Sequence, residues 1–256
     1  KGDEIELRHG DYSPTGVTAK IVGVKLLDKA KRKYEFVFDR DLSEPAQEGF
    51  IMFNRRFDSR NIILRGCYFH HCKARGMLLL GRDILVENCR FVATGKGAMN
   101  IESGYTFNLW SEGYGAYNII VRGCLFDAVN PRGMQHDGKP HDIYIGVYMM
   151  TDPSYMRTDY PLFHDILIKN NTFKNTYGLA AFISSAKNVV VKNNTFENTL
   201  PREKPLYYRS AFWVAHASDI FIVNNVFKPN GLAPNAGVFF DSESVKNLTF
   251  KGNSIE

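Results

Sequence analysis

The sequence has little of what marks several common protein classes. No apolar run approaches the roughly 18 residues of a membrane-spanning helix, although 44% of the 256 residues are hydrophobic. Lys and Arg total 32 against 27 for Asp and Glu, and along the chain the two signs are interspersed. Such a small, dispersed excess is typical of a solvated surface. We therefore expect neither a membrane span nor nucleic-acid binding.

The chain also lacks apolar stripes with a period of 3.6 residues, which excludes solenoids that need a helix in each repeat. It has instead a nine-residue phrase that occurs seven times. The copies are NIILRGCYF (61–69), DILVENCRF (83–91), NIIVRGCLF (118–126), DILIKNNTF (165–173), NVVVKNNTF (188–196), DIFIVNNVF (219–227) and NLTFKGNSI (247–255). Such a repeat cannot bury its own apolar face and stacks on its neighbours.

Each place of the phrase predicts a structural role. The second and fourth places are always apolar, the period of a strand with one face inward. The sixth place is always Gly or Asn, which tolerate positive φ and predict a left-handed corner. The seventh is Cys in three copies and Asn in four. In stacked turns this place forms an inward column whose amides bond one another.

The steps between the final residues of successive phrases are 22, 35, 47, 23, 31 and 28 residues. About 22 residues fit one coil with three corners. A second apolar run lies within most coils: 77–80, 98–101, 179–183, 212–215 and 238–240. The fold class is therefore all-β: a right-handed, pectate-lyase-like parallel β-helix of about seven coils over 53–256.

Residues 1–52 do not show the repeat. They hold three alternating strand patterns separated by turn residues and predict a small antiparallel β-barrel-like or sandwich-like segment. The chain opens within a strand pattern, with neither an initiator methionine nor a signal. We expect it to come from a longer protein.

The four cysteines predict packed, reduced thiols. Cys67, Cys89 and Cys124 share the seventh place, and Cys72 follows a turn. A metal site at Cys67, His70, His71 and Cys72 lacks a second paired half. We expect no metal and no cofactor.

The third place of the phrase faces outward, yet it is apolar in six copies. Only the last copy has a polar residue there, Thr249. An exposed apolar stripe of this length is a binding or aggregation liability. We expect a second subunit or another part of the protein to cover it.

The two longest steps contain loops at 101–115 and 131–161, rich in aromatic residues, carboxylates and glycine. Neighbouring loops on a solenoid form a cleft wall, and aromatic faces with carboxylates and amides suit sugars. The sequence thus predicts glycan binding at these loops.

Four segments carry a resemblance to a known family: ARGMLLLGRDILVENCRF, GAMNIES, FNLWSEG and PLFHDILIKNNTF. The chain resembles, over nearly its whole length, the bacterial exo-acting α-1,3-galactosidases, which remove terminal galactose from blood-group-B-type and related glycans. The resemblance implies a β-helix with an inserted β-barrel, with residues 1–52 as an incomplete insert, and a periplasmic or secreted location. It also implies an inverting, metal-independent glycoside hydrolase with two catalytic carboxylates. The paired aspartates of that family have no counterpart here, because the sequence contains no Asp-Asp pair.

The catalytic residues thus stay unknown, with Glu102 and Glu112 as weak candidates. Substrate binding is predicted at Trp110, Glu112, Asn108, Glu102, Arg75, His136 and Asp137. Surface carboxylates, loop braces and a solvated arginine are the competing structural interpretations. His216, near a corner on the same side as Ser185, is a weaker candidate.

Three other residues favour a structural reading. Trp213 lies in a strand pattern, and Asp142 and Asp165 precede apolar runs as turn residues. Two alternatives to the hydrolase remain. A Ca²⁺-dependent polysaccharide lyase would need clustered carboxylates, and a non-catalytic glycan-binding solenoid would keep only the aromatic loop.

Overall fold

The structure is a computed structural model, and it describes residues 1–42, 46–106, 110–131, 140–151, 154–197, 210–228 and 237–256. The chain divides into two compact units, Lys1–Asp58 and Ser59–Glu256. The division lies six residues after the boundary expected at 52/53. None of the described segments contains a helix long and apolar enough to cross a membrane.

The first unit is an antiparallel sheet with the strand order β3-β2-β1-β4. Its strands are β1 (Glu4–Arg8), β2 (Pro14–Asp28), β3 (Lys33–Phe38) and β4 (Ile51–Asn54), followed by the short 3₁₀ turn η1 (Arg55–Phe57). Its core consists of Ile5, Leu7, Ala19, Ile21 and Leu42. The alternation along β1 places Ile5 and Leu7 on the same face, where both contribute to this core.

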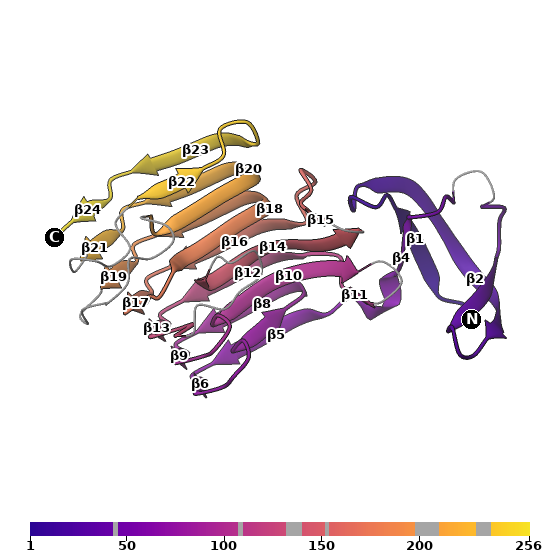
Figure 1. Cartoon of the computed structure of the whole chain (residues 1–256), viewed down its shortest axis with the longest axis horizontal. Helices are drawn as coiled ribbons and strands as arrows, with labels where there is room; N and C mark the ends of the chain where they lie inside the picture. Colours follow the sequence, from indigo (N-terminus) through magenta and orange to yellow (C-terminus); the bar gives the residue numbers. More distant parts are fainter. Residues whose placement is uncertain (43–45, 107–109, 132–139, 152–153, 198–209, 229–236) are drawn as a thin grey trace. The chain divides into compact units, whose positions relative to one another are not determined.

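The second unit is a stack of parallel coils, which Figure 1 shows from β5 and β6 to β23 and β24. The first part of each phrase forms β5 (Arg60–Arg65), β8 (Gly81–Glu87), β12 (Ala116–Arg122), β16 (Phe163–Lys169), the second halves of β18 (Leu179–Lys192) and β20 (Phe212–Val223), and β23 (Val245–Lys251). The end of each phrase forms β6 (Tyr68–His70), β9 (Arg90–Val92), β13 (Leu125–Asp127), β17 (Thr172–Lys174), β19 (Thr195–Glu197), β21 (Val226–Lys228) and β24 (Ser254–Ile255). These strands pair in parallel with the same phrase place opposite itself.

The additional apolar runs form a further row of strands. They are β7 (Met77–Leu79), β10 (Met99–Thr106), β14 (His141–Thr151), the first halves of β18 and β20, and β22 (Val238–Phe240). Two short strands, β11 (Trp110–Glu112) and β15 (Ser154–Met156), fold back antiparallel on β10 and β14.

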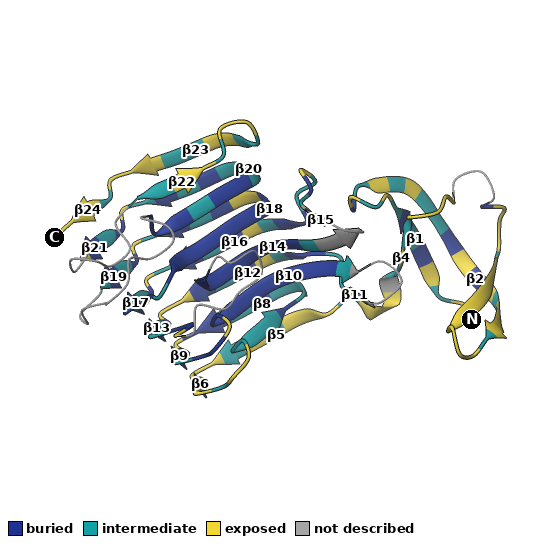
Figure 2. Cartoon of the chain, viewed as in Figure 1, coloured by how far each residue is buried: buried dark blue, intermediate teal, exposed yellow. Residues whose placement is uncertain are grey.

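The second and fourth places of the phrase form the core, as the sequence predicts. In the central coils these side chains are fully or almost fully buried, for example Ile119, Val121 and Ile168. Figure 2 shows the strands of the central coils largely buried and those of the first and last coils more exposed. The end coils have a stacked neighbour on only one side, which explains this gradient.

Every phrase has two left-handed corners. The predicted corner at the sixth place is confirmed in all seven copies, with φ between 53° at Asn88 and 67° at Gly252. The first place, always Asn or Asp, is also left-handed in every copy, from Asn61 to Asn247. The sequence interpretation missed this second corner, although Asn and Asp are the non-glycine residues that adopt such φ values most readily.

Side chains bond between coils at this first corner. Asn118 Nδ2 donates to Asp83 Oδ1 over 2.7 Å, and Asn247 Nδ2 donates to Asp219 Oδ1 over 2.9 Å. The alternation of Asp and Asn from coil to coil therefore supplies an acceptor and a donor to each pair.

The inward column at the seventh place is also confirmed. Asn171, Asn194 and Asn225 are buried, and each amide donates to the carbonyl oxygen of the next asparagine at 3.0 Å, ending at Asn253. The same oxygens accept backbone N–H groups, so the column satisfies buried polar groups along its length. All four cysteines are free thiols, as predicted.

The final phenylalanines of the phrases form a parallel stack inside the coil. Neighbouring ring centroids lie 4.6 to 5.1 Å apart from Phe69 to Phe227. These rings bury a large apolar area on one side of the core.

The outward third place is partly covered by its own neighbours. Ile63, in the first coil, is 62% exposed, whereas Leu85, Ile120, Leu167, Val190, Phe221 and Thr249 are half-buried.

Asp142 does not act as a turn residue, contrary to the sequence interpretation. It lies inside β14, is buried, and accepts a hydrogen bond from Thr176 Oγ1 over 2.8 Å. The segment from His141 resembles the start of a phrase but belongs to the other row of strands, where His141 pairs with Leu179. Asp165 does occupy a left-handed corner, with φ of 56°.

Candidate functional site

The predicted residue Glu102 lies on the outward face of β10. Its neighbours Ile101 and Ser103 point the other way, since side chains alternate along a strand. Ser103 Oγ accepts the backbone N–H of Gly115 over 2.7 Å, which ties the strand to the returning chain. Glu102 is only 5% exposed. A carboxylate so enclosed needs compensating partners.

One of these partners is Asn100, two residues earlier on the same face. Asn100 Nδ2 donates to Glu102 Oε2 over 2.8 Å. Asn100 pairs in register with Tyr144 of β14, and Glu102 with Gly146. Glu102 therefore lies on the same surface as the Tyr144 ring, two residues further along the strands.

Glu112 is on the hairpin that follows. It pairs directly with Gly104 across β10 and β11. Directly opposed residues of an antiparallel pair project to the same face, so Glu112 shares the face of Glu102. The structure thus brings the two predicted carboxylates to one side of one hairpin, with Glu112 the more exposed.

Aromatic residues continue this face along the stack. Tyr144, Phe182, Trp213 and Phe239 occupy matching positions in successive coils. Their ring centroids are 4.8, 4.6 and 6.3 Å apart and their planes are nearly parallel. The first two rings are buried, Trp213 is half-buried and Phe239 is 52% exposed. The aromatic ladder therefore opens to solvent toward the later coils.

Arg157 lies over this ladder. Its guanidinium carbon is 4.6 Å from the centroid of Phe182 and 5.8 Å from that of Trp213. Its Nη1 donates to the Tyr144 hydroxyl over 3.2 Å. Burial lowers the pKa of Arg157 to about 10. Burial and the nearby Glu102 raise the pKa of Tyr144, so both side chains keep their usual charge at neutral pH.

Gly146 makes room for the Tyr144 ring. A Cβ at this position would lie 3.2 Å from three atoms of that ring, including the hydroxyl oxygen. The glycine thereby lets the tyrosine lie flat along the sheet next to Glu102.

Two buried polar atoms of this face have no hydrogen-bond partner among the described residues. They are Asn100 Oδ1 and Ser184 Oγ, in residues at most 1% exposed. An unpartnered buried polar group costs about 1–3 kcal/mol. Ligand hydroxyl groups can supply the partners.

The other predicted residues are distributed differently. Arg75 precedes β7 and lies level with the start of β10. In register it is five residues before Glu102, which separates the two residues by about 16 Å along the strands. The Trp110 backbone pairs with Thr106 in the hairpin; its side chain, together with Asn108, His136 and Asp137, lies outside the described residues. The sequence interpretation missed Tyr144 and Arg157. Both lie within the long 131–161 segment, and no local motif distinguishes them from the other aromatic and basic residues of that segment.

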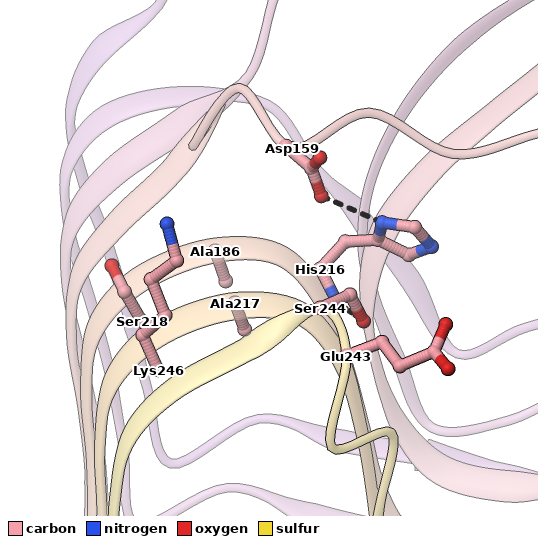
Figure 3. Close-up of a pocket in the computed structure, with 8 residues that line it drawn as sticks. All are labelled: Asp159, Ala186, His216, Ala217, Ser218, Glu243, Ser244 and Lys246. Atoms are coloured by element: carbon pink, nitrogen blue, oxygen red, sulfur yellow. Dashed lines mark hydrogen bonds and ion pairs between the residues drawn. The ribbon is translucent and has the colours of Figure 1, made fainter.

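His216 lies in a separate pocket of about 220 Å³, where β18 and β20 bend (Figure 3). The backbone of His216 has a positive, left-handed φ, as does that of Ser185 at the equivalent bend of the preceding coil. His216 Nδ1 contacts Asp159 Oδ1 at 2.7 Å, and its backbone N–H donates to Ser244 Oγ at 2.9 Å. The Asp159 side chain is 82% exposed, so water screens this contact.

Glu243, Lys246, Ala186 and Ala217 also line this pocket. The pocket is thus polar and of mixed charge. Its lining residues lie on different strand segments from Glu102.

No described residues form a metal-binding group of three or more His, Cys, Asp and Glu side chains. Around the cysteines considered in the sequence, His70 Nδ1 lies 3.2 Å from His71 Nδ1, and the Cys72 thiol donates to the Ala74 carbonyl.

Comparison with known proteins agrees with the coil geometry. Residues 142–256 match the family model of the right-handed β-helix region. The fold is a right-handed parallel β-helix. No curated protein matches the sequence significantly.

Two solved structures are similar to this β-helix. The surface protein and adhesin PfbA of Streptococcus pneumoniae is 15% identical with a TM-score of 0.49, over 77% of this chain and 59% of the adhesin chain. A candidate glycosyl hydrolase from Parabacteroides merdae is 13% identical with a TM-score of 0.28, over 71% of this chain and 82% of that one. The present chain thus spans less than two thirds of the length of the adhesin structure.

Proposed function

We propose that this chain belongs to a carbohydrate-active protein that binds a glycan on the outward face of β10, β14 and β18. The single observation that carries the proposal is the placement of Glu102. This enclosed carboxylate is bonded by the Asn100 amide and lies beside a ladder of parallel aromatic rings. Carboxylates and amides bind sugar hydroxyls, and flat aromatic faces pack against sugar rings.

The two unpartnered atoms support this assignment. Asn100 Oδ1 accepts and Ser184 Oγ both donates and accepts hydrogen bonds. Together with the Glu102 carboxylate they form a set that matches vicinal hydroxyl groups. Phe239, at the open end of the ladder, provides an apolar face for a further sugar unit.

The finer proposal is a glycoside hydrolase that removes terminal α-1,3-linked galactose with inversion. It rests on the resemblance of this chain to that family of galactosidases, carried by segments within 74–113 and by 161–173. Inversion requires one carboxylic acid to protonate the leaving oxygen and one carboxylate to activate water. We assign Glu102 and Glu112 to substrate binding and the acid and base to segments of a longer protein.

Calorimetric titration of this chain with an α-1,3-linked galactose disaccharide tests the binding step. Glu102→Gln keeps the shape of the side chain but removes its charge, and a loss of affinity of about tenfold is expected, the effect of one charged hydrogen bond. Glu197→Gln, in a half-buried glutamate of β19 on another face, is the matched control and should bind normally. Equal affinity of both variants and the parent chain would contradict the site.

Product analysis then tests the chemistry with the longest available form of the protein. Free galactose of inverted configuration supports the hydrolase. An unsaturated product that depends on Ca²⁺ would identify a lyase instead, and binding without turnover would identify a glycan-binding solenoid.

A further inference from the structure

The fifth place of the phrase forms an outward row that is strongly basic. Its members, in spatial order, are Arg65, Glu87, Arg122, Lys169, Lys192, Val223 and Lys251. We call the five cations of this set the basic row. Along the sequence successive fifth-place residues are 22 to 47 positions apart, so the charges look dispersed. Coiling places them on adjacent strands about 4.8 Å apart.

The one carboxylate in this row is already neutralised. Glu87 is hydrogen-bonded by both Arg122 and Arg65, which lower its pKa. Because both arginines already bond the Glu87 carboxylate, this carboxylate does not neutralise the neighbouring lysines. The row therefore keeps a clear positive excess.

Three cations follow one another directly. Arg122 pairs in register with Lys169, and Lys169 with Lys192. Like charges directly opposite each other on a sheet destabilise it. No described carboxylate forms an ion pair with either lysine. An anion bound across the three strands would offset this repulsion.

Protection of a sheet edge does not explain these residues. Lysines often guard exposed edge strands against association. However, β12, β16 and β18 are interior strands with a hydrogen-bonded neighbour on each side. Of the basic row, only Arg65 on β5 and Lys251 on β23 lie on the end strands of the stack.

An apolar row runs parallel to the basic row, two residues away. It contains the half-buried third-place residues, among them Ile120, Leu167 and Val190. On the far side of this apolar row, before the first corner, Lys187 adds further positive charge, whereas Arg82 forms an ion pair with Asp83 over 3.0 Å. The surface therefore combines a flat aliphatic strip with cations along it.

We propose that this face binds an acidic polysaccharide, a glycan chain that carries carboxylate or sulfate groups, laid across the strands. The closely spaced cations match a polymer with regularly repeated anions, and the aliphatic strip matches the apolar faces of sugar rings. Nucleic acid fits less well. Single strands are usually held by stacking on aromatic rings, and of the third- and fifth-place residues only Phe221 is aromatic in the interior coils. This surface differs from the Glu102 face and does not depend on the function proposed there.

Binding can be measured by titration of the intact chain with polygalacturonate, chondroitin sulfate, uncharged dextran and single-stranded DNA. We expect both acidic glycans to bind and dextran not to bind, with affinity falling as salt rises. Because chondroitin sulfate carries carboxylates as well as sulfates, tighter binding of it than of polygalacturonate would indicate a contribution from the sulfate groups.

The double variant Lys169→Gln with Lys192→Gln should lose about tenfold in affinity, as expected for two partly exposed charge contacts. Lys174→Gln with Lys228→Gln removes the same net charge from β17 and β21 on another face and is the matched control. An equal loss in both variants would show a net-charge effect only and overturn the proposal. It is overturned as well if neither acidic glycan binds, if dextran binds equally, or if DNA binds more tightly with the same sensitivity to Lys169 and Lys192. Concentration-dependent dimers that dissociate in the Lys169 and Lys192 variant would assign the face to a second copy instead.

Discussion

The side chain of Asn194 accepts two hydrogen bonds from a single residue of the preceding coil. Its Oδ1 receives the Asn171 backbone N–H at 2.9 Å and the Asn171 amide at 3.0 Å. Its own Nδ2 donates to the Ile168 carbonyl and to Asn225. One side chain thus connects three successive coils in the dry interior.

Asn194→Ala should therefore destabilise the protein strongly. The change leaves buried donors on Asn171 and the Ile168 carbonyl without partners, at a cost of about 3 kcal/mol or more in the free energy of unfolding. Urea denaturation measures this loss. Asn193→Gly, one residue earlier at an exposed left-handed corner, is the control and should change stability little. Similar losses in the two variants would disprove the special role of the column.

The first-place corner can be separated into its two contributions at Asn188. This residue has φ of 53°, and its Nδ2 donates to Asp165 Oδ1 over 2.6 Å. Both Asn188→Gly and Asn188→Ala remove the hydrogen bond, but alanine keeps a Cβ in the left-handed region whereas glycine removes it. We expect the alanine variant to be less stable than the glycine variant by about 1 kcal/mol. Equal urea midpoints would show that this corner is not strained.

Alkaline pH should destabilise the protein through Cys124. Burial raises the pKa of this thiol from 9.0 to about 11. Between these two values the unfolded chain releases a proton that the folded chain retains, so stability is complete below pH 9 and falls as the pH rises. The loss is about 2 kcal/mol. Comparing the pH dependence of unfolding with that of Cys124→Ala isolates this contribution, because all other alkaline groups are shared. Parallel curves for the two proteins would refute it.

The contact between Arg157 and Trp213 has a spectroscopic test. In a Trp110→Phe background, Trp213 is the only tryptophan. Arg157→Met keeps much of the aliphatic bulk but removes the charge over the Trp213 and Phe182 rings, so the emission maximum should shift and stability should fall by about 1 kcal/mol. Arg90→Met, which removes a cation over Tyr68 in the first coils, serves as the control and should leave the emission unchanged. An unchanged spectrum of the Arg157 variant would place the guanidinium away from the ring.

The scaffold was predictable because each place of the phrase has one dominant physical requirement. Ile119 and Val121 must be inward, Asn88 must tolerate positive φ, and Asn171 needs a polar partner, so local chemistry and fold agree. Asp142 was misread because HDIYI has the same apolar alternation as a true phrase. Periodicity alone does not distinguish the two rows of strands.

The candidate site was predictable only in part. Glu102 and Glu112 flank one loop and are close in sequence, so their shared hairpin follows from local reasoning. Tyr144 reaches this site because β14 pairs with β10, and Arg157 reaches it through the chain that follows β15. No single segment of the sequence encodes these long-range contacts. The basic row shows the same limit, since its charges are adjacent only after coiling.

The phenylalanine stack also bears on how such a protein can change during evolution. Phe69 and Phe91 are 22 residues apart in the chain and their rings lie 5.0 Å apart; Phe126 and Phe173 are 47 residues apart and lie 4.6 Å apart. The contact distance is thus nearly independent of the length of the intervening segment. Insertions between corners can vary in length and composition while the packing on either side is inherited unchanged, so new surface chemistry can arise without a new solution to the folding problem.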